Sequence, residues 1–404
     1  MIVCVQIPRF ALAVAAGGRD ALAAGPVALA PEPGREQFIG EVSAAAEAYG
    51  LRAGLRLGEA LARCPTLRLV APDPAGVADA WEAHVRALEG IGAAVEPGAP
   101  GIAWFASGGI RALHGGTLEG VLAAARRALR GAHRTAPGAP VRLGAAPSRF
   151  AAFAAAGRAR ARRPEIAPLA NAALAAYLAP LPVSLLLARP EVALLPDALE
   201  RFGIGTLGAL ARLPRAALAD RFGPAGPVAR DLAKGKDTPL VPRVPEEGLE
   251  ERLELQESAS GTQLQRGLEL LIDRLLARRE RRGRSLRAVV LSAQLVEGGT
   301  WRARLTFREA LADPRRMRLA ITGRLTELPA PADSLRLRVE AFGPPNGDQR
   351  SLLSEPAAIR RARLREAVRQ TRAAAGPDAA LRILAVDPDS RVPERRLALA
   401  PWEP

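Results

Sequence analysis

The stretch IVCVQIPRFALAVA, residues 2–15, is the part of this 404-residue chain that decides the fold. It begins inside a short apolar run, residues 1–7, of the kind that forms a buried strand. Working outward, strands are predicted at residues 101–105 and 141–144 and a helix at residues 147–163. Alternating short strands and helices favour an α+β domain. The stretch itself contains no Asp or Glu.

Two helix–turn–helix units are predicted after this domain. An arginine-rich run at residues 158–163, followed by proline, marks the boundary. In the helical region beyond it, FGIGTLGALARLP at residues 202–214 predicts a helix, a tight turn at Gly203-Ile204-Gly205 and a second helix. Residues 221–237 form a second such unit. A linker rich in Pro and Glu, residues 239–248, closes the region.

A small sheet with helices on one face is predicted nearer the C-terminus. Apolar and polar residues alternate, as in half-buried strands, at residues 251–256, 287–294, 300–308 and 334–342. Helices are predicted at residues 262–282 and 314–328, and a hairpin turn at Glu297-Gly298-Gly299. The β-α-β-β-α-β order implies a sheet covered on one face. The tail holds a charged helix, residues 359–375, and the segment SRVPERR, residues 390–396.

The formal net charge of +15 and the isoelectric point near 11.2 indicate a polyanionic partner, most simply nucleic acid. The alternative is a compositional bias of the genome. Lysine occurs only at Lys234 and Lys236, so arginine carries nearly all the positive charge in a chain rich in Ala, Gly and Pro.

Neither cysteine nor histidine usage suggests a metal site. Cys4 and Cys64 form neither a disulfide framework nor a zinc motif, so a reducing cytoplasm is expected. His84, His114 and His133 lack the spacing of metal ligands, and the acids Glu96, Asp73 and Asp79 are scattered and expected at the surface. We therefore expect no metal and no other cofactor.

Two further patterns concern targeting and membranes. The N-terminus lacks the basic start and long apolar core of a signal peptide. Residues 166–188 carry no charge over a span of membrane length, but they contain three prolines, and alanine is their commonest residue. They are interpreted as a buried helix and turn.

Three segments together resemble the signature blocks of the Y-family (translesion) DNA polymerases. They are residues 2–15, YGLRAGLRLGEALARCP at residues 49–65 and RLGAAPSRFAAFAAA at residues 142–156. The resemblance extends over residues 1–343. It implies a right-hand fold with a palm at 1–165, fingers inserted at about 16–75, a helix-hairpin-helix thumb at 166–240, a little finger at 249–343 and a tail at 344–404. Within this family, the tail and the absence of acidic residues at the metal-binding positions make the chain most similar to ImuB-type mutagenesis proteins. These are regarded as non-catalytic hubs of a bacterial translesion complex.

The resemblance implies acidic metal ligands at positions where this chain has none. The family's first strand reads Asp, apolar, Asp, any, Phe, and its first ligand falls on Gln6. A later Asp-Glu pair falls on Gly101 and Ile102. Nucleotidyl transfer uses two metal ions, and Mg²⁺ prefers carboxylate oxygens, so the expected protein is a pseudoenzyme without catalytic residues.

Other positions that the resemblance assigns are altered as well. The residue that screens out ribonucleotides is Ala11, the triphosphate-binding Tyr and Arg are Ala44 and Glu47, and the late palm Lys is Phe153. Two alternatives stay open. One is an active low-fidelity polymerase with a rearranged metal site. The other is a helix-hairpin-helix DNA-binding protein unrelated to polymerases, which leaves the N-terminal blocks unexplained.

Candidate DNA contacts come from three places. The turn at Gly203 and Gly205 lets a backbone phosphate approach the free N–H groups of a helix start. RRERRGRSLR contributes six arginines, and two more lie on one face of the predicted hairpin: Arg278, Arg279, Arg281, Arg282, Arg284, Arg287, Arg302 and Arg304. These arginines would bind phosphates by charge, the alternative being a solvated helix end and sheet face.

The segment Gln349-Arg350-Ser351-Leu352-Leu353 resembles the short motif by which bacterial replication proteins bind the sliding clamp. It lies in a linker bounded by Pro and Gly, where a peptide is free to dock through its leucines. The resemblance implies two further partners, an error-prone C-family polymerase and a RecA-like accessory protein.

Overall fold

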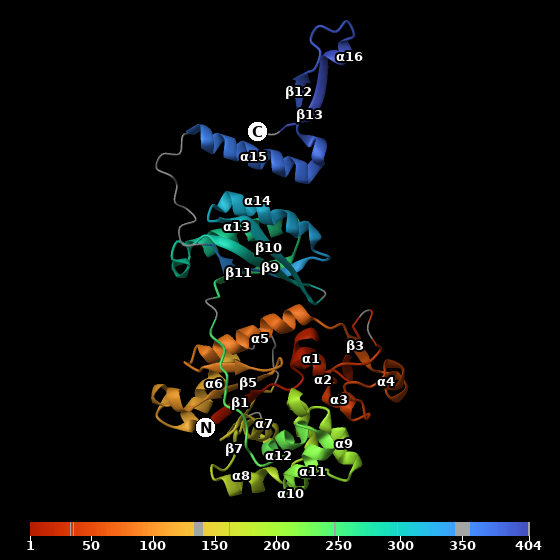
Figure 1. Ribbon diagram of the computed structural model, residues 1–404, viewed down its shortest axis with the longest axis vertical. Coiled ribbons are helices and arrows are strands. Elements are labelled where there is room, and N and C mark those ends of the chain that lie inside the picture. Colours follow the sequence, from red (N-terminus) through yellow and green to blue (C-terminus); the bar gives the residue numbers. More distant parts are fainter. Residues whose placement is uncertain are drawn as a thin grey trace. The chain divides into compact units, whose positions relative to one another are not determined.

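The computed structural model describes residues 1–32, 34, 36–132, 140–160, 162–245, 248–296, 298–343 and 356–402 (Figure 1). The chain forms two compact units, one of Met1–Arg282 and Leu286–Phe342, the other of Gly283–Ser285 and Gly343–Pro404. Helices and sheets are mixed throughout, so the α+β class is confirmed.

A five-stranded sheet is the centre of the N-terminal part. Its order is β4-β5-β1-β6-β7, with β1 antiparallel to both neighbours. Successive side chains of a strand point to opposite faces. Val3 and Val5 therefore join the core under α5 (Pro74–Glu89) and α6 (Leu118–Ala132), while Cys4 joins the core on the side of α7 (Arg149–Arg158). The strands are β1 (Ile2–Gln6), β4 (Val95–Pro97), β5 (Ile102–Ala106), β6 (Arg142–Ala146) and β7 (Glu165–Ile166).

A small inserted subdomain has a separate core. Its strands β2 (Val27–Leu29) and β3 (Arg68–Val70) pair in parallel. The chain between them contains α3 (Ala44–Glu47) and α4 (Leu57–Arg63), and buries a cluster that includes Ile39 and Leu51. Two short helices, α1 (Phe10–Ala15) and α2 (Arg19–Ala23), lead from β1 into it.

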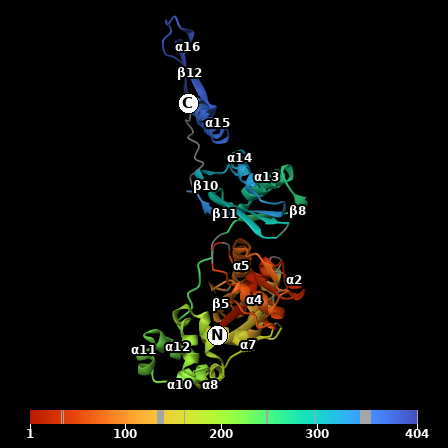
Figure 2. The same cartoon turned by 90° about the vertical axis from the view of Figure 1, so that its right-hand side faces the viewer.

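The predicted helical region consists of short helices around buried leucines. The uncharged stretch 166–188 forms a helix and a 3-10 turn, with Leu174, Leu178 and Leu186 buried, as expected. Among the described residues, no helix is both long enough and apolar enough to cross a membrane. Figure 2 shows these helices gathered beside α7. They are α8 (Asn171–Leu178), α9 (Leu195–Arg201), α10 (Leu207–Arg212), α11 (Arg215–Phe222) and α12 (Ala225–Ala233).

The linker after α12 is bound tightly to the first sheet and to α5. Arg243 N donates to Val95 O at 2.8 Å, and Val241 N donates to the Glu96 carboxylate at 2.6 Å. The Arg243 guanidinium spans two carboxylates of α5, those of Glu82 and Glu89, each at 2.7 Å. Burial raises the pKa of Glu82, but Arg243 and then Arg86 outweigh it and hold that pKa below its ordinary value of 4.5.

Replacing Arg243 by glutamine is expected to lower the free energy of unfolding by about 1–3 kcal/mol at neutral pH, because the partly buried carboxylates of Glu82 and Glu89 both lose their ion pair with Arg243. A carboxylate with a depressed pKa stabilises the fold above its unfolded pKa, and this stabilisation is lost as pH falls through the folded pKa. The difference between wild type and variant should therefore shrink below about pH 4.5. Urea unfolding of wild type and variant, at neutral pH and below about pH 4.5, measures this difference in the free energy of unfolding. Arg215→Gln, which breaks the exposed pair with Asp231, is the control and should cost less than about 1 kcal/mol.

A second, four-stranded sheet follows the linker in the order β10-β9-β11-β8. The predicted β-α-β-β-α-β order is confirmed, with strands β8 (Glu250–Ala259), β9 (Leu286–Leu295), β10 (Thr300–Leu311) and β11 (Ala332–Phe342) and helices α13 (Thr262–Ala277) and α14 (Pro314–Thr322). Both helices pack on one face, where Leu305 and Leu337 are buried. The opposite face carries Arg302, Arg304 and Arg336.

Two predicted helices of this part are shorter than expected. The helix predicted to residue 282 ends at Ala277, because Arg278 adopts an extended backbone and a 3-10 turn follows. The Arg281 side chain donates to Leu276 O at 3.0 Å and so satisfies a carbonyl at the helix end. The helix predicted to residue 328 ends at Thr322 and continues as a 3-10 turn.

The second unit contains the predicted charged helix as α15 (Pro356–Ala375) and an antiparallel pair that the sequence did not predict. This pair is β12 (Leu381–Ala385) and β13 (Leu397–Pro401). SRVPERR lies in the connection between them, and its last residues form the short helix α16 (Pro393–Arg396). The clamp-like residues Gln349, Ser351, Leu352 and Leu353 lie outside the described residues.

Candidate nucleic-acid interface

The three positions without the expected acids meet at one end of the first sheet. The pairing of β1 with β5 puts Gln6 opposite Ile102, and Ile7 N donates to Gly101 O at 2.8 Å. The pairing of β1 with β6 puts Arg142 on the other side of Gln6. The Gln6 Oε1 atom is buried and accepts no hydrogen bond from any described residue. At this end of the first sheet, an amide, a glycine and an isoleucine therefore occupy the positions at which acidic residues were expected.

Gly101 has a backbone that excludes an ordinary side chain. Its φ is +93°, in the left-handed region that favours glycine. A Cβ atom at this position would lie 2.6 Å from Ile7 O and 3.0 Å from Phe10 Cβ. An Asp at residue 101 would therefore strain the backbone and collide with the β1–α1 connection.

The acids near this centre have other partners. Among the residues that the structure describes, no group of three or more His, Cys, Asp or Glu side chains is arranged to hold a metal ion. Glu96 accepts from Val241 N and pairs with Arg149. Asp73 and Asp79 were expected at the surface, which is wrong: each is less than a tenth exposed. Asp73 caps α5 through Gly76 N at 2.8 Å, and Asp79 pairs with arginines of the second sheet.

The inserted subdomain is tied to the start of α1 by two of its acids. Arg9, in a left-handed conformation at φ +55°, pairs with Glu47 of α3 at 2.6 Å and donates to Val42 O at 2.8 Å. The Glu41 carboxylate accepts from Leu12 N at 2.9 Å, in the first turn of α1. These carboxylates satisfy the positive end of α1 and its neighbouring guanidinium from within the chain.

The predicted glycine turn lies between α9 and α10. Gly203 has φ +75° and donates to Glu200 O, which closes α9, and Thr206 caps α10 by accepting from Ala209 N at 3.2 Å. A Cβ atom at Gly203 or Gly205 would meet nothing within 4 Å. The space beside the turn is therefore open, and a phosphate contact there stays a prediction. Phe202 beside it is about half exposed.

The predicted arginine cluster occupies the connection from α13 to β9, where the chain keeps its members close together. Arg279 and Arg282 are exposed, and Arg282 adopts φ +52°. Several members also have structural contacts: Arg278 pairs with Glu251 at 2.5 Å, Arg281 caps α13, and Arg287 donates to Arg308 O. Arg284 is half-buried.

Arg302 and Arg304 share a face of β10, as predicted, but have different partners. Arg304 pairs with Glu340 of β11 at 2.5 Å and remains largely exposed. Arg302 pairs with Asp79 of α5 and lies within reach of Ala75 O. Its charge is thus engaged by the N-terminal part of the same unit.

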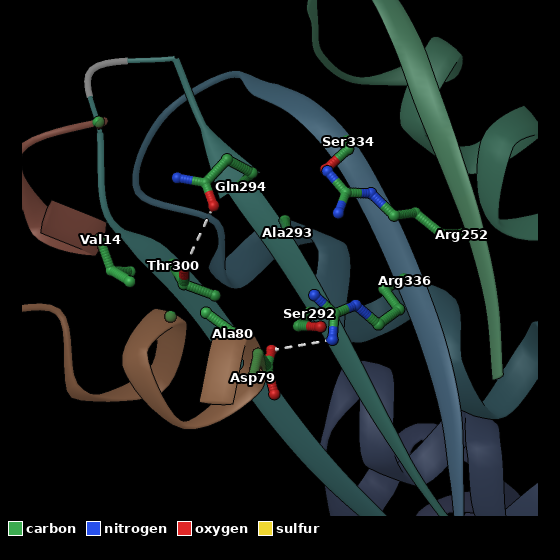
Figure 3. A pocket seen from close by; sticks show the side chains of 12 residues that line it. Val14, Asp79, Ala80, Arg252, Ser292, Ala293, Gln294, Thr300, Ser334 and Arg336 are labelled. Carbon is green, nitrogen blue, oxygen red and sulfur yellow. Dashed lines mark hydrogen bonds and ion pairs between the residues drawn. The ribbon is translucent and has the colours of Figure 1, made fainter. Parts of the chain in front are cut away.

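A polar cavity of about 250 Å³ lies between α5 and the second sheet (Figure 3). No site was predicted from the sequence at the side chains that line it: Asp79 from α5, Arg252 from β8, Ser292 and Gln294 from β9, Thr300 from β10, and Ser334 and Arg336 from β11. A signal was present, because serine and glutamine interrupt the apolar run VVLSAQL of β9 at alternate positions, on the face that α13 and α14 leave open.

Comparisons with known proteins show what the chain is similar to. Residues 5–157 match the model of the impB/mucB/samB family. A Y-family polymerase chimera of Dbh and Dpo4 and an insertion ternary complex of Dbh DNA polymerase are each similar at 15% identity and TM-score 0.49, over 85% of this chain and 99% of theirs. DinB from Sulfolobus solfataricus is similar at 15% identity and TM-score 0.48, over 84% of this chain and 98% of its own. No curated protein matches the chain by sequence.

Proposed function

We propose that this chain, whose residues 5–157 match the impB/mucB/samB family, is a Y-family polymerase homologue that serves as a non-catalytic DNA-binding scaffold of bacterial translesion synthesis. It would hold primer-template DNA without reading sequence, through the glycine turn at Gly203 and Gly205 and the arginine cluster of the α13–β9 connection. Both features bind phosphates, which every DNA sequence offers.

The observation that carries the proposal is the centre formed by Gln6, Gly101 and Ile102. Two-metal nucleotidyl transfer needs carboxylates that neutralise the metal ions and hold them a few ångströms apart. An amide oxygen and an isoleucine supply no negative charge. The φ of +93° at Gly101 also disfavours an acid at that position in this backbone.

The contacts of the inserted subdomain support the same proposal. A nucleotide triphosphate approaching the start of α1 would meet the carboxylates of Glu41 and Glu47, which already hold Leu12 N and Arg9. Like charges repel, and a neutralised guanidinium attracts a phosphate less. A chain that no longer binds nucleotides has no need to keep this end of α1 free.

The partners of the scaffold are proposed from the resemblance to ImuB-type proteins. The segment from Gln349 to Leu353 would recruit the sliding clamp, and an error-prone C-family polymerase would carry out synthesis together with a RecA-like accessory protein. In such an assembly the scaffold keeps the clamp, the DNA and the polymerase close together and so raises their effective concentration.

The purified protein is expected to show no primer extension. The assay contains primed template, all four deoxynucleotides and either Mg²⁺ or Mn²⁺, and products are separated on a sequencing gel. Gln6→Ala is the matched variant, because it alters the centre without touching the DNA-binding surfaces. Extension by wild type that disappears in Gln6→Ala would overturn the proposal in favour of an active polymerase with a rearranged site.

A further inference from the structure

The open face of the second sheet carries a row of three arginines and one serine that runs across all four strands. Strand pairing places Arg302 of β10 beside Ser292 of β9, Ser292 beside Arg336 of β11, and Arg336 beside Arg252 of β8. Three strand spacings of about 4.8 Å give the row a length of about 14 Å, much longer than an isolated phosphate. We call Arg302, Ser292, Arg336 and Arg252 the arginine row.

A carboxylate from another part of the unit lies on this row. Asp79 pairs with Arg302 and, at 3.5 Å, with Arg336, although it lies more than 220 residues before either. Figure 3 shows Asp79 on α5 facing Arg336 across the cavity. Asp79 lies in the middle of α5 and caps neither end, so its partners are the arginines of the row.

One carboxylate does not neutralise the row. Arg252 lines the same cavity, donates to Ser334 Oγ at 3.5 Å, and pairs with the largely exposed Glu254 at 2.8 Å. Ser292 and Ser334 add hydroxyl groups in the cavity, both on residues that are about 5% exposed. Guanidinium and hydroxyl donors in a row suit the oxygens of successive phosphodiesters.

We propose that Asp79 is a built-in competitor of DNA at the arginine row. Its carboxylate takes the position of a backbone phosphate while the protein is free of DNA, and α5 must separate from the sheet before nucleic acid occupies the row. The inference rests on the proposed DNA-binding function and adds a regulation that this function does not require.

The geometry explains why separation is feasible. Besides the pairs of Asp79, the contact between α5 and β10 includes the hydrogen bond from Thr300 Oγ1 to Asp73 at 2.9 Å. These contacts are polar, and the cavity lies beside them. A polar, incompletely packed contact opens at less cost than an apolar core, and phosphates replace the carboxylates on the arginines after it opens.

Asp79→Asn tests the proposal through DNA affinity. Fluorescence anisotropy with a labelled primer-template is expected to show about 5-fold or tighter binding, because the amide no longer competes with phosphate. The control is Glu327→Gln, which makes the same charge change on the helix-covered side, where Glu327 pairs with Arg324. The control is expected to change affinity less than about 2-fold. Equal effects of the two variants would overturn the proposal.

A reversible cross-link between α5 and the second sheet, called the lock below, gives a second test. It leaves Asp79 and the residues of the arginine row unchanged. Asp73 and Thr300 are in hydrogen-bond contact, so a Cys pair at these positions would cross-link α5 to the sheet, and the native Cys4 and Cys64 are buried. The oxidised protein is expected to bind DNA at least about 5-fold more weakly than the same protein after reduction. Equal affinities would contradict the inference.

The measurements distinguish failure of the proposed scaffold function from failure of the competitor role of Asp79. If wild type, Asp79→Asn and the reduced lock all leave DNA unbound, the proposed function fails and the inference with it. If all of them bind DNA, and neither Asp79→Asn nor oxidation of the lock changes the affinity, the scaffold function stands and only the competitor role of Asp79 is wrong. Arg336→Gln should weaken binding and remove most of the gain of Asp79→Asn in the double variant.

Discussion

Replacing Arg279 and Arg282 by glutamine is expected to weaken DNA binding on the order of 10- to 60-fold near 0.1 M salt. Each arginine that neutralises a phosphate releases counterions, so the log–log salt slope should flatten by about 0.7–0.9 per contact. Both side chains are exposed, whereas Arg281 is kept because it caps α13 and its loss would confuse binding with folding. Fluorescence anisotropy over a salt series measures affinity and slope together.

The control for this prediction is the double variant Arg315→Gln and Arg316→Gln in α14. It removes the same charge from the helix-covered face of the same sheet, where Arg316 pairs with Glu309. A general effect of net charge would weaken both double variants equally. An unchanged slope in the first variant would mean that the α13–β9 arginines are a solvated loop.

Replacing Gln349, Leu352 and Leu353 by alanine is expected to abolish clamp binding. Burying two leucines gives roughly 3–6 kcal/mol, less the cost of ordering a linker, which predicts a contact of micromolar strength. Losing both leucines should weaken it about 100-fold or more, beyond detection at ordinary concentrations. Surface plasmon resonance with the cognate clamp tests this.

A matched variant in the same linker, Ser354→Ala with Glu355→Ala, should bind the clamp as wild type does. DNA affinity and thermal unfolding should be unaffected in both variants, because a linker segment contributes little to a core. If the triple variant binds the clamp normally, the motif is a coincidence and any clamp contact lies elsewhere.

Local pattern in the sequence was enough to predict the second sheet. Alternation along β9, β10 and β11 and the glycines at 298 and 299 predicted these strands, their order along the chain and the hairpin, because buried faces and turns follow from neighbouring residues. The end of α13 was missed for the converse reason. Arginine has good helix propensity, so the run after Ala277 continued the helical pattern although the chain turns there.

The candidate sites likewise include contacts that could be predicted from the sequence and contacts that could not. The meeting of Gln6 with Gly101 and Ile102 was predictable once the chain was aligned with a known family. The ion pair between Arg302 and Asp79 was not predictable, because 223 residues separate the two side chains. The sequence around each residue contains no signal for the other. Asp73 and Asp79 were assigned to the surface for that reason. The β12–β13 hairpin was missed because five-residue strands give too little alternation to stand out.

If the proposed non-catalytic function is correct, the backbone of Gly101 has an evolutionary consequence. A codon change that put Asp at residue 101 would meet Ile7 O and Phe10 before it could offer a ligand. Gln6 and the loop before β5 would have to change as well, and none of these steps alone would restore activity. For the proposed non-catalytic scaffold, the backbone of Gly101 would therefore oppose a return to metal-dependent catalysis by a single substitution.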